Sequence, residues 1–385
     1  MRDFINPKVK EIKPSGIRKF FDIASEIKGA ISLGVGEPDF DTPWHIREEG
    51  IYSLERGKTH YTSNSGLKEL REEICKYYDR KYNLSYSLDE SLVTVGGSEA
   101  IDLAIRALVC PGDEVIVTTP CYVSYEPLVT LSNGVVKTIS LKNENQFRLT
   151  KEELEDSITP KSKILIINYP NNPTGAIMEK SDLEALRDVI IKNDLFVISD
   201  EIYSELSYEK PHVSIASLEG MKERTLVING FSKAFSMTGW RLGYALGNKE
   251  IIKQMTKIHQ LAIMCAPTQS QYAAIEALRN GDNDVIEMKE SYNERRRYVL
   301  KRLKDMNLPC FEPKGAFYVF PDIRRFNMSS DEFCLKLLNE EKVVVVPGNA
   351  FGDSGDGFIR ISYAYSLESL KNALNKIEQF IKKLS

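Results

Sequence analysis

The chain has 385 residues, of which 42% are hydrophobic and 28% charged, and its formal net charge is -4 at pH 7. This length exceeds what one simple core needs and predicts about two domains. The charge lacks the basic footprint of nucleic-acid binders, and no apolar run approaches the roughly 20 residues of a membrane span. We therefore expect neither nucleic acid nor a membrane as a partner.

The cysteines and histidines indicate neither a disulfide framework nor a metal site. The six cysteines are scattered without a CxxC pair, and the four histidines share no ligand spacing. The N-terminus lacks the apolar run of a secretory signal. We expect no metal site, no disulfides and a cytoplasmic protein. The basic cluster Arg295-Arg296-Arg297, next to Glu294, predicts a solvated helix face.

Seven apolar, β-branched runs in the first part of the chain predict strands, namely 92–95, 114–118, 135–139, 163–168, 195–199, 225–229 and 242–246. Several are apolar nearly throughout, which is typical of strands buried on both faces. Amphipathic segments at 98–109 and 181–192 predict helices, the second with a capping box formed by Ser181 and Glu184. Strands that alternate with helices predict a mostly parallel α/β sheet.

The pattern changes past residue 285. A charged helix at 284–306 leads into shorter predicted strands at 316–320, 342–346 and 358–363, with a helix at 330–340. This is typical of a smaller α+β unit, and we expect residues 31–38 to pack with it. The predicted division is a large domain at 46–285 and a small domain formed by 1–45 and 286–385.

Two motifs follow predicted strands at the end where open parallel sheets place ligands. Gly96-Gly97-Ser98-Glu99 opens a helix, where backbone N–H groups can bind a phosphate. The alternative is a tight turn with Ser98 as the N-cap. The segment NYPNNPTG at 168–175 predicts a rigid loop that positions the Asn172 amide, although Asn-Pro is also typical of ordinary turns.

Two more motifs carry charged side chains at strand ends. Asp200, after a buried strand, either caps the next helix or holds a protonated group, because a buried carboxylate needs a cationic partner. Lys233 follows the strand at 225–229, and Arg241 comes eight positions later. A lysine here is usually a surface charge, but burial in a pocket would lower its pKa and allow it to form a Schiff base.

In this order the motifs resemble class I aminotransferases of fold type I, which use pyridoxal 5'-phosphate (PLP). The resemblance runs from ISLGVGEPDF at 31–40 to FIRIS at 358–362 and covers about nine-tenths of the chain. Its most specific parts are 172–175 and 233–241. It implies an α/β fold with a mostly parallel seven-stranded sheet in a large PLP-binding domain, plus a smaller α+β domain.

The resemblance also implies a role for each site residue. The catalytic set would be Lys233, which carries PLP, Asp200, which pairs with the ring nitrogen, and Tyr203, which bonds the ring oxygen together with Asn172. Further cofactor contacts would come from Tyr122 on the ring face and from Gly97, Ser98, Ser232 and Arg241 at the phosphate.

The implied substrate site lies at the other end. Arg360 would bind the substrate α-carboxylate, with Gly36, Tyr122 and Asn172 around it. Tyr61 would reach the phosphate of a neighbouring subunit, which implies a homodimer with shared active sites. The partners would be an amino acid and a 2-oxo acid such as 2-oxoglutarate, converted in a ping-pong reaction.

Departures from the family pattern bear on the substrate. Ser98 stands where some aspartate-specific relatives carry a lysine, and Gly230 stands where some branches carry a phosphate-binding serine, which Ser232 could replace. Residues 15–20 (SGIRKF) are similar to branches that use aromatic or longer amino acids. We expect an aromatic or broadly chosen donor first, aspartate second and an acylated diaminopimelate third.

Two rival functions share parts of this pattern. A PLP-dependent C–S β-lyase would also use Lys233, Asp200 and Arg241, although residues 229–243 resemble the transaminase pattern more closely. A ligand-sensing regulator would need an additional DNA-binding module, for which we expect no room. Phe317 and Tyr318 are expected in the core of the small domain. Hydrophobic residues near Ile17 and Phe20 could close over a substrate.

Overall fold

The computed structural model describes residues 2–12, 27 and 29–384. Its largest sheet has seven strands in the order β2-β8-β7-β6-β5-β3-β4. The strands are β2 (Ser91–Thr94), β3 (Glu114–Thr119), β4 (Val135–Ser140), β5 (Ser162–Asn168), β6 (Phe196–Asp200), β7 (Thr225–Gly230) and β8 (Gly243–Leu246). All seven predicted strands are confirmed, each to within one residue at either end.

The sheet is mostly parallel, as predicted. Strands β4, β3, β5, β6 and β7 run parallel to one another, and only β8 lies antiparallel to both of its neighbours. Asn168 at the end of β5 lies in register with Asp200 at the end of β6. The carboxyl ends of the central strands, which carry the motifs, therefore meet at one edge of the sheet.

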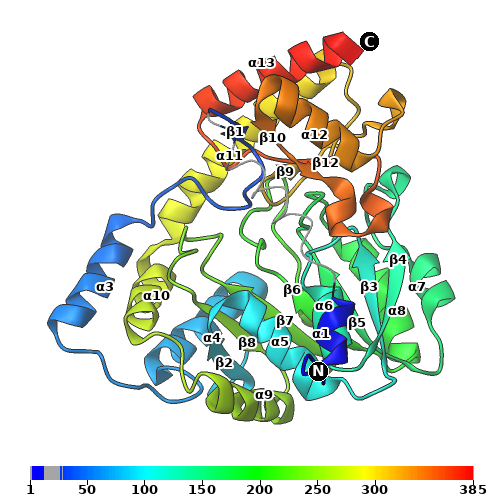
Figure 1. Cartoon of the computed structure of the whole chain (residues 1–385). Coiled ribbons are helices and arrows are strands. Elements are labelled where there is room, and N and C mark those ends of the chain that lie inside the picture. Colours follow the sequence, from blue (N-terminus) through cyan, green and yellow to red (C-terminus); the bar gives the residue numbers. More distant parts are fainter. Residues whose placement is uncertain (1, 13–26, 28, 385) are drawn as a thin grey trace.

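Helices cover both faces of this sheet (Figure 1). They are α4 (Lys68–Tyr82), α5 (Gly96–Leu108), α6 (Tyr125–Leu131), α7 (Lys151–Ser157), α8 (Lys180–Lys192), α9 (Lys249–Ala262) and α10 (Thr268–Asn280), while α3 (Trp44–Glu55) lies to the side and packs against α10. In β5, Ile164 and Ile166 pack with α5 and α9, whereas Leu165 and Ile167 pack with α8. Successive side chains of a strand point to opposite faces, so an unbroken apolar run fills both cores.

Two details of the helix starts differ from the prediction. Helix α5 begins at Gly96 with Val95 as its N-cap, so Ser98 lies inside the first turn and is not the cap. Helix α8 begins at Lys180, and its capping box joins Glu179 to Asp182. The predicted box of Ser181 and Glu184 is wrong because the N-cap is Glu179, two residues earlier than Ser181.

The C-terminal elements form a separate layer, at the top of Figure 1. They are α11 (Asp282–Asp305), β9 (Tyr318–Val319), α12 (Ser330–Glu341), β10 (Val343–Val344), β11 (Val346–Pro347), β12 (Ile359–Ser362) and α13 (Leu367–Leu384). One buried cluster joins α11, α12 and α13 to these strands. Strand β1 (Ile31–Ser32) pairs with β10, which confirms that the segment at 31–38 packs with this layer.

Helix α11 turns two of its arginines inward. Arg295 bonds Asp39 at 2.6 Å, and Arg296 bonds the Pro313 carbonyl at 2.7 Å and Glu312 at 3.1 Å. Both side chains are buried, and only Arg297 of the cluster is exposed. The predicted solvated face is therefore wrong for Arg295 and Arg296, whose charges are paired with Asp39 and Glu312.

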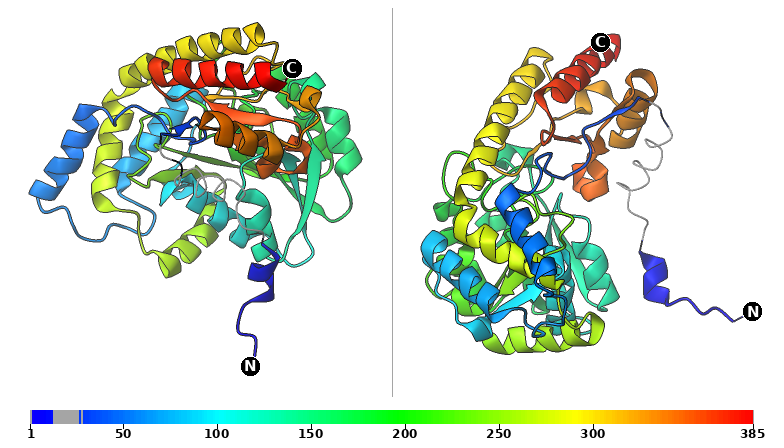
Figure 2. Two further views of the ribbon diagram at one scale, coloured as in Figure 1. Left: turned by 45° about the horizontal axis from the view of Figure 1, so that its top comes forward. Right: turned by 90° about the vertical axis from the view of Figure 1, so that its left-hand side faces the viewer.

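The ends of the chain lie far apart. The short helix α1 (Pro7–Glu11) contacts α6 at the periphery, whereas the C-terminus lies beyond α13 at the opposite end (Figure 2). In the part of the chain that the structure describes, no helix has the length and apolar character to cross a membrane. The segment at 15–20, with Ile17 and Phe20, lies outside the described residues.

Candidate active site

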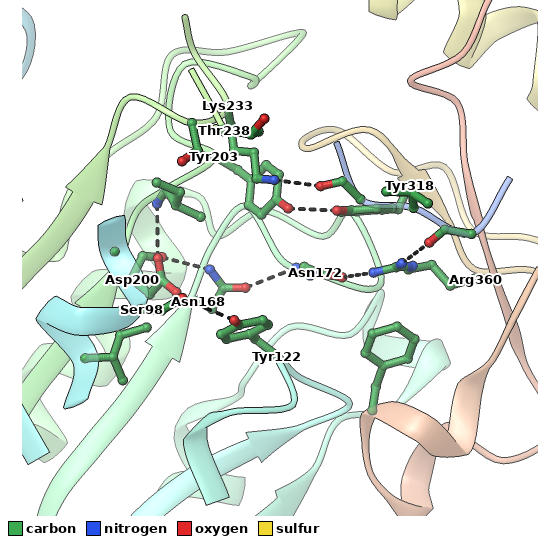
Figure 3. Close-up of a pocket in the computed structure, with 18 of the residues that line it drawn as sticks. Ser98, Tyr122, Asn168, Asn172, Asp200, Tyr203, Lys233, Thr238, Tyr318 and Arg360 are labelled. Carbon is green, nitrogen blue, oxygen red and sulfur yellow. Dashed lines mark hydrogen bonds between the residues drawn. The ribbon is translucent and has the colours of Figure 1, made fainter. Parts of the chain in front are cut away.

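A cavity of about 370 Å³ lies where the carboxyl ends of β5, β6 and β7 face the C-terminal layer (Figure 3). It brings together residues from widely separated motifs. Of the predicted site residues, all but Tyr61 line it, namely Gly36, Gly97, Ser98, Tyr122, Asn172, Asp200, Tyr203, Ser232, Lys233, Arg241 and Arg360. The sequence motifs therefore converge on one site.

Lys233 projects into this cavity from the turn that follows β7. Its Nζ donates a hydrogen bond of 2.6 Å to the Gly36 carbonyl. Burial lowers the pKa of its ammonium group to about 8. The alternative of an ordinary surface lysine is wrong, and a larger fraction of this amine is in the neutral, nucleophilic form near pH 7 than for a solvated lysine.

Asp200 ends β6 with its carboxylate buried at the floor of the cavity. Tyr125 donates to Oδ2 at 2.6 Å, and the Ile202 backbone N–H donates to Oδ1 at 3.2 Å. Burial raises the pKa of the carboxyl to about 6, against the effect of these hydrogen bonds. No helix follows, so Asp200 is not a helix cap. Among residues 2–12, 27 and 29–384, no salt bridge reaches it, so a cationic ligand would complete its environment.

Arg360 on β12 supplies the opposite charge at the far end of the cavity (Figure 3). Its guanidinium donates to the Asn172 side-chain oxygen at 2.8 Å and to the Gly34 carbonyl. The Nε atom is buried and has no hydrogen-bond partner among the described residues, and no carboxylate there pairs with this arginine. A ligand carboxylate would therefore stabilise it.

The loop before α5 and the turn that carries Arg241 form a third feature. Arg241 adopts a left-handed backbone conformation with a φ of 52°, which is uncommon for a residue with a side chain. A Cβ atom added at Gly96 would lie 2.9 Å from the Arg241 guanidinium. The glycine keeps open a small space between the helix N-terminus and a cation, a combination suited to an anionic group such as a phosphate.

Aromatic residues enclose the cavity. The hydroxyl groups of Tyr203 and Tyr318 form a hydrogen bond of 2.7 Å. The Tyr318 ring lies 4.5 Å from the Arg360 guanidinium. Phe317 is fully buried, as predicted for the core. Tyr318 is also fully buried in the core cluster of the C-terminal layer, as predicted, and in addition it lines the cavity.

Comparison with known proteins shows where this arrangement belongs. The family model "Aminotransferase class I and II" matches residues 28–377. The aspartate aminotransferase of Pyrococcus abyssi is 46% identical over 96% of each chain, and the aromatic-amino-acid aminotransferase 2 of Thermococcus litoralis is 44% identical over 98% of each.

The chain belongs to the class I and II aminotransferase family. Its structure matches the crystal structure of an aromatic aminotransferase from Pyrococcus horikoshii with a TM-score of 0.91 and 44% identity, over 95% of this chain and 100% of that one. These matches confirm the expected fold type I of PLP-dependent transferases. They also confirm that the chain is an aminotransferase.

Some residues of the aminotransferase site were not singled out from the sequence. Asn168 donates to the Asp200 backbone carbonyl at 2.9 Å and accepts from the Asn172 N–H at 3.0 Å, and so ties two predicted residues together. Thr238 and Phe351 line the same cavity. Asn168 belongs to the NYPNNPTG motif, so a signal was present, but no sequence pattern marks the contacts made by Phe351.

The structure also shows the surroundings of Gly230, Ser232 and Tyr61. A Cβ at Gly230 would lie 3.0 Å from the Leu242 carbonyl and 3.1 Å from the Gly243 Cα at the start of β8, so a serine there would fit only if these atoms shifted. Ser232 lines the cavity. Tyr61, by contrast, is 81% exposed and lies outside the cavity of this single chain.

Proposed function

We propose that this aminotransferase holds PLP on Lys233 and moves amino groups between amino acids and 2-oxo acids. The observation that carries the proposal is that one cavity holds three ionisable groups that have no salt-bridge partner among the described residues. These are an amine of lowered pKa at Lys233, a buried carboxylate without a cation at Asp200 and a buried guanidinium without an anion at Arg360. An amino acid bound beside PLP would complete all three.

The residues present fit the cofactor. Asp200 suits a protonated ring nitrogen, and Gly97, Ser98, Ser232 and Arg241 suit the phosphate. When bound, PLP supplies an electron sink for the negative charge that develops at the substrate Cα. Tyr203 and Asn172 would donate hydrogen bonds to the ring oxygen, and Tyr122 would lie on the ring face.

Lys233 has a second role in this proposal. Because its pKa is about 8, the amine can be either protonated or neutral near neutral pH. The Nζ atom can therefore accept the proton from the substrate Cα and later return it. Arg360 would hold the α-carboxylate through a two-pronged contact and so present the Cα–H bond to Lys233.

The surroundings of the substrate favour apolar side chains. Val35, Ile101 and Phe351 line the cavity together with the rings of Tyr122 and Tyr318. In the described part of the chain its cationic lining consists of Lys233, Arg241 and Arg360, each of which already has a role. We therefore propose an aromatic or broadly chosen amino donor, with a 2-oxo acid such as 2-oxoglutarate as acceptor.

The assembly and division of the chain are part of the same proposal. A tyrosine that is 81% exposed suits contact with a second copy, so we propose a homodimer in which Tyr61 reaches the phosphate site of the partner. We further propose a large domain at 46–285 and a small domain of 1–45 and 286–385, supported by their separate sheets. The cysteines form no disulfides, which suits the cytoplasm.

A spectroscopic half-reaction tests this function. Purified protein loaded with PLP is mixed with single amino acids in the absence of any oxo acid, and the visible absorption band is followed. Loss of the band with release of the matching 2-oxo acid is expected, fastest for phenylalanine and tyrosine. A strong kcat/KM preference for aspartate would instead support an aspartate aminotransferase. Release of pyruvate and ammonia from cystathionine or cysteine would support a C–S β-lyase.

A further inference from the structure

Tyr318 connects the two ends of the cavity. Its hydroxyl lies 2.7 Å from the Tyr203 hydroxyl, and its ring lies 4.5 Å from the Arg360 guanidinium. Figure 3 shows Tyr318 between these two side chains. Tyr203 follows β6 of the large sheet, whereas Tyr318 and Arg360 belong to the neighbouring strands β9 and β12. One side chain thus touches both a proposed cofactor contact and the proposed carboxylate contact.

The position of the Tyr318 hydroxyl is fixed by its surroundings. A Cβ added at Gly36 would overlap that hydroxyl, so the absence of a side chain at Gly36 makes room for it. The Gly36 carbonyl accepts the hydrogen bond from Lys233. Tyr318 and Tyr203 are both buried, so neither hydroxyl can exchange its partner for bulk water.

The protons of the pair determine its direction. Burial raises the pKa of both phenols, so each carries one proton near neutral pH. If Tyr203 donates its proton into the cavity, the hydrogen bond between the tyrosines must be donated by Tyr318. Hydrogen bonds in such a chain polarise one another, so the Tyr318 hydroxyl strengthens the donation made by Tyr203.

We propose that Tyr318 is a positioning residue with two separable actions. Its hydroxyl strengthens the hydrogen bond from Tyr203 to the cofactor ring oxygen, and its ring holds the Arg360 guanidinium in place for the substrate carboxylate. This inference rests on the proposed PLP function and assigns the two effects to different atoms of one side chain. Variants that remove only the hydroxyl or the whole ring separate them.

The hydroxyl is tested by a pH titration of the visible band of the PLP-loaded protein. A hydrogen bond to the ring oxygen favours the deprotonated chromophore, so Tyr318→Phe should raise the titration midpoint by about half a unit to one unit. In a Tyr203→Phe background the same change should add no further shift, because no donor remains to be strengthened. An additive shift in the double variant would overturn the action through Tyr203.

The ring is tested by carboxylate binding to the same loaded protein. The probe is 3-phenylpropionate, which has a carboxylate but no amine to react, and its dissociation constant is measured from the change in the visible band. Tyr318→Phe keeps the ring and should leave the constant within twofold. Tyr318→Leu should weaken binding about five- to tenfold, because the guanidinium loses one of its two aromatic neighbours and keeps only the Phe351 ring, 4.7 Å away. Equal affinity in both variants would overturn this action.

Tyr363→Phe is the matched control. The Tyr363 hydroxyl is also buried and donates to the Ala316 carbonyl at 3.1 Å, but it lies outside the cavity. A shift of the midpoint as large as that of Tyr318→Phe would show a general structural effect and overturn the inference. If the unchanged protein forms no visible band with PLP, the proposed function itself fails, whereas a normal band with an unshifted Tyr318→Phe midpoint refutes the inference alone.

Discussion

The hydroxyl of Tyr125 donates a hydrogen bond of 2.6 Å to the carboxylate of Asp200, and both side chains are buried. Tyr125 is the first residue of α6 and lies three positions after Tyr122, whose ring it meets edge-on at 5.6 Å between centroids. Burial raises the pKa of Asp200, and the Tyr125 hydrogen bond opposes that rise. Tyr125 therefore stabilises the ionised form of the proposed partner of the cofactor ring.

Replacement of Tyr125 by Phe should weaken cofactor binding. The Asp200 carboxylate loses a donor, so its pKa rises further and its ionised form becomes less available to a cation. We expect an increase of about tenfold in the dissociation constant of PLP, measured by absorbance titration of the cofactor-free protein. The control is Tyr169→Phe, which removes a buried hydroxyl bonded to the Phe147 carbonyl at 3.1 Å. An equal loss of affinity in the control would contradict this role.

Asp200→Asn should change stability in a pH-dependent manner. The folded, cofactor-free protein holds the pKa of Asp200 at about 6, above its ordinary value of 3.8. The neutral carboxyl thus favours the folded state below about pH 4, and this contribution is lost as the pH rises through about 6. Asparagine stays neutral throughout. We therefore expect Asp200→Asn to gain about 1–3 kcal/mol relative to the unchanged protein between pH 4.5 and 7.5.

Urea unfolding of the cofactor-free proteins at these two pH values measures that difference. When PLP is added at pH 7.5, the unchanged protein should become the more stable of the two. It binds the cofactor more tightly than Asp200→Asn, and a bound ligand stabilises the folded state. A stability difference that stays constant with pH would contradict the raised pKa.

Arg360→Lys should reduce catalysis although it preserves the charge. Lysine lacks the planar fork that contacts Asn172, Gly34 and, in our proposal, both oxygens of a carboxylate. We expect kcat/KM to fall about 100-fold for amino acids and oxo acids alike, measured in steady state. The exposed Arg324 pairs with Asp322, and Arg324→Lys should change kcat/KM less than twofold. A loss of less than threefold at Arg360 would exclude it as the carboxylate contact.

Gly36→Ala should damage the site by steric overlap with the Tyr318 hydroxyl. The overlap should displace that hydroxyl or the Gly36 carbonyl, which accepts the hydrogen bond from Lys233. This displacement should cost about 1–3 kcal/mol of stability and slow the half-reaction. Gly239→Ala is the control, because a Cβ there meets nothing within 4 Å. Urea unfolding and the rate of loss of the visible band check both variants. Equal behaviour of the two would show that the space at Gly36 is not needed.

Much of the large sheet could be predicted because buried parallel strands are unbroken apolar runs. The small strands were harder. The sequence predicts one strand at 342–346, but the structure has two strands there, of which β10 pairs with β1 and β11 pairs with β12. Val343 to Val346 are all apolar and buried, so no change of pattern marks the point at which the chain changes partners.

The site residues that lie in local motifs could likewise be predicted, whereas those that act through distant contacts could not. Lys233, Asp200 and Arg360 lie in local motifs and were predicted by resemblance. The functions of Tyr125 and Tyr318 arise from pairs that are 75 and 115 positions apart in the sequence. Arg295 and its partner Asp39 are separated by 256 positions. Such contacts depend on the folded chain, and a single sequence contains no local pattern that specifies them.

Reductive trapping tests whether PLP binds covalently to Lys233. The purified protein is incubated with PLP, reduced with sodium borohydride, digested and mapped by mass spectrometry. We expect the cofactor mass on the peptide that contains Lys233, and neither the mass nor a visible band in Lys233→Ala. A label spread over surface lysines, or equal labelling of Lys233→Ala, would contradict the assignment of Lys233 and with it the proposed amino transfer at this site.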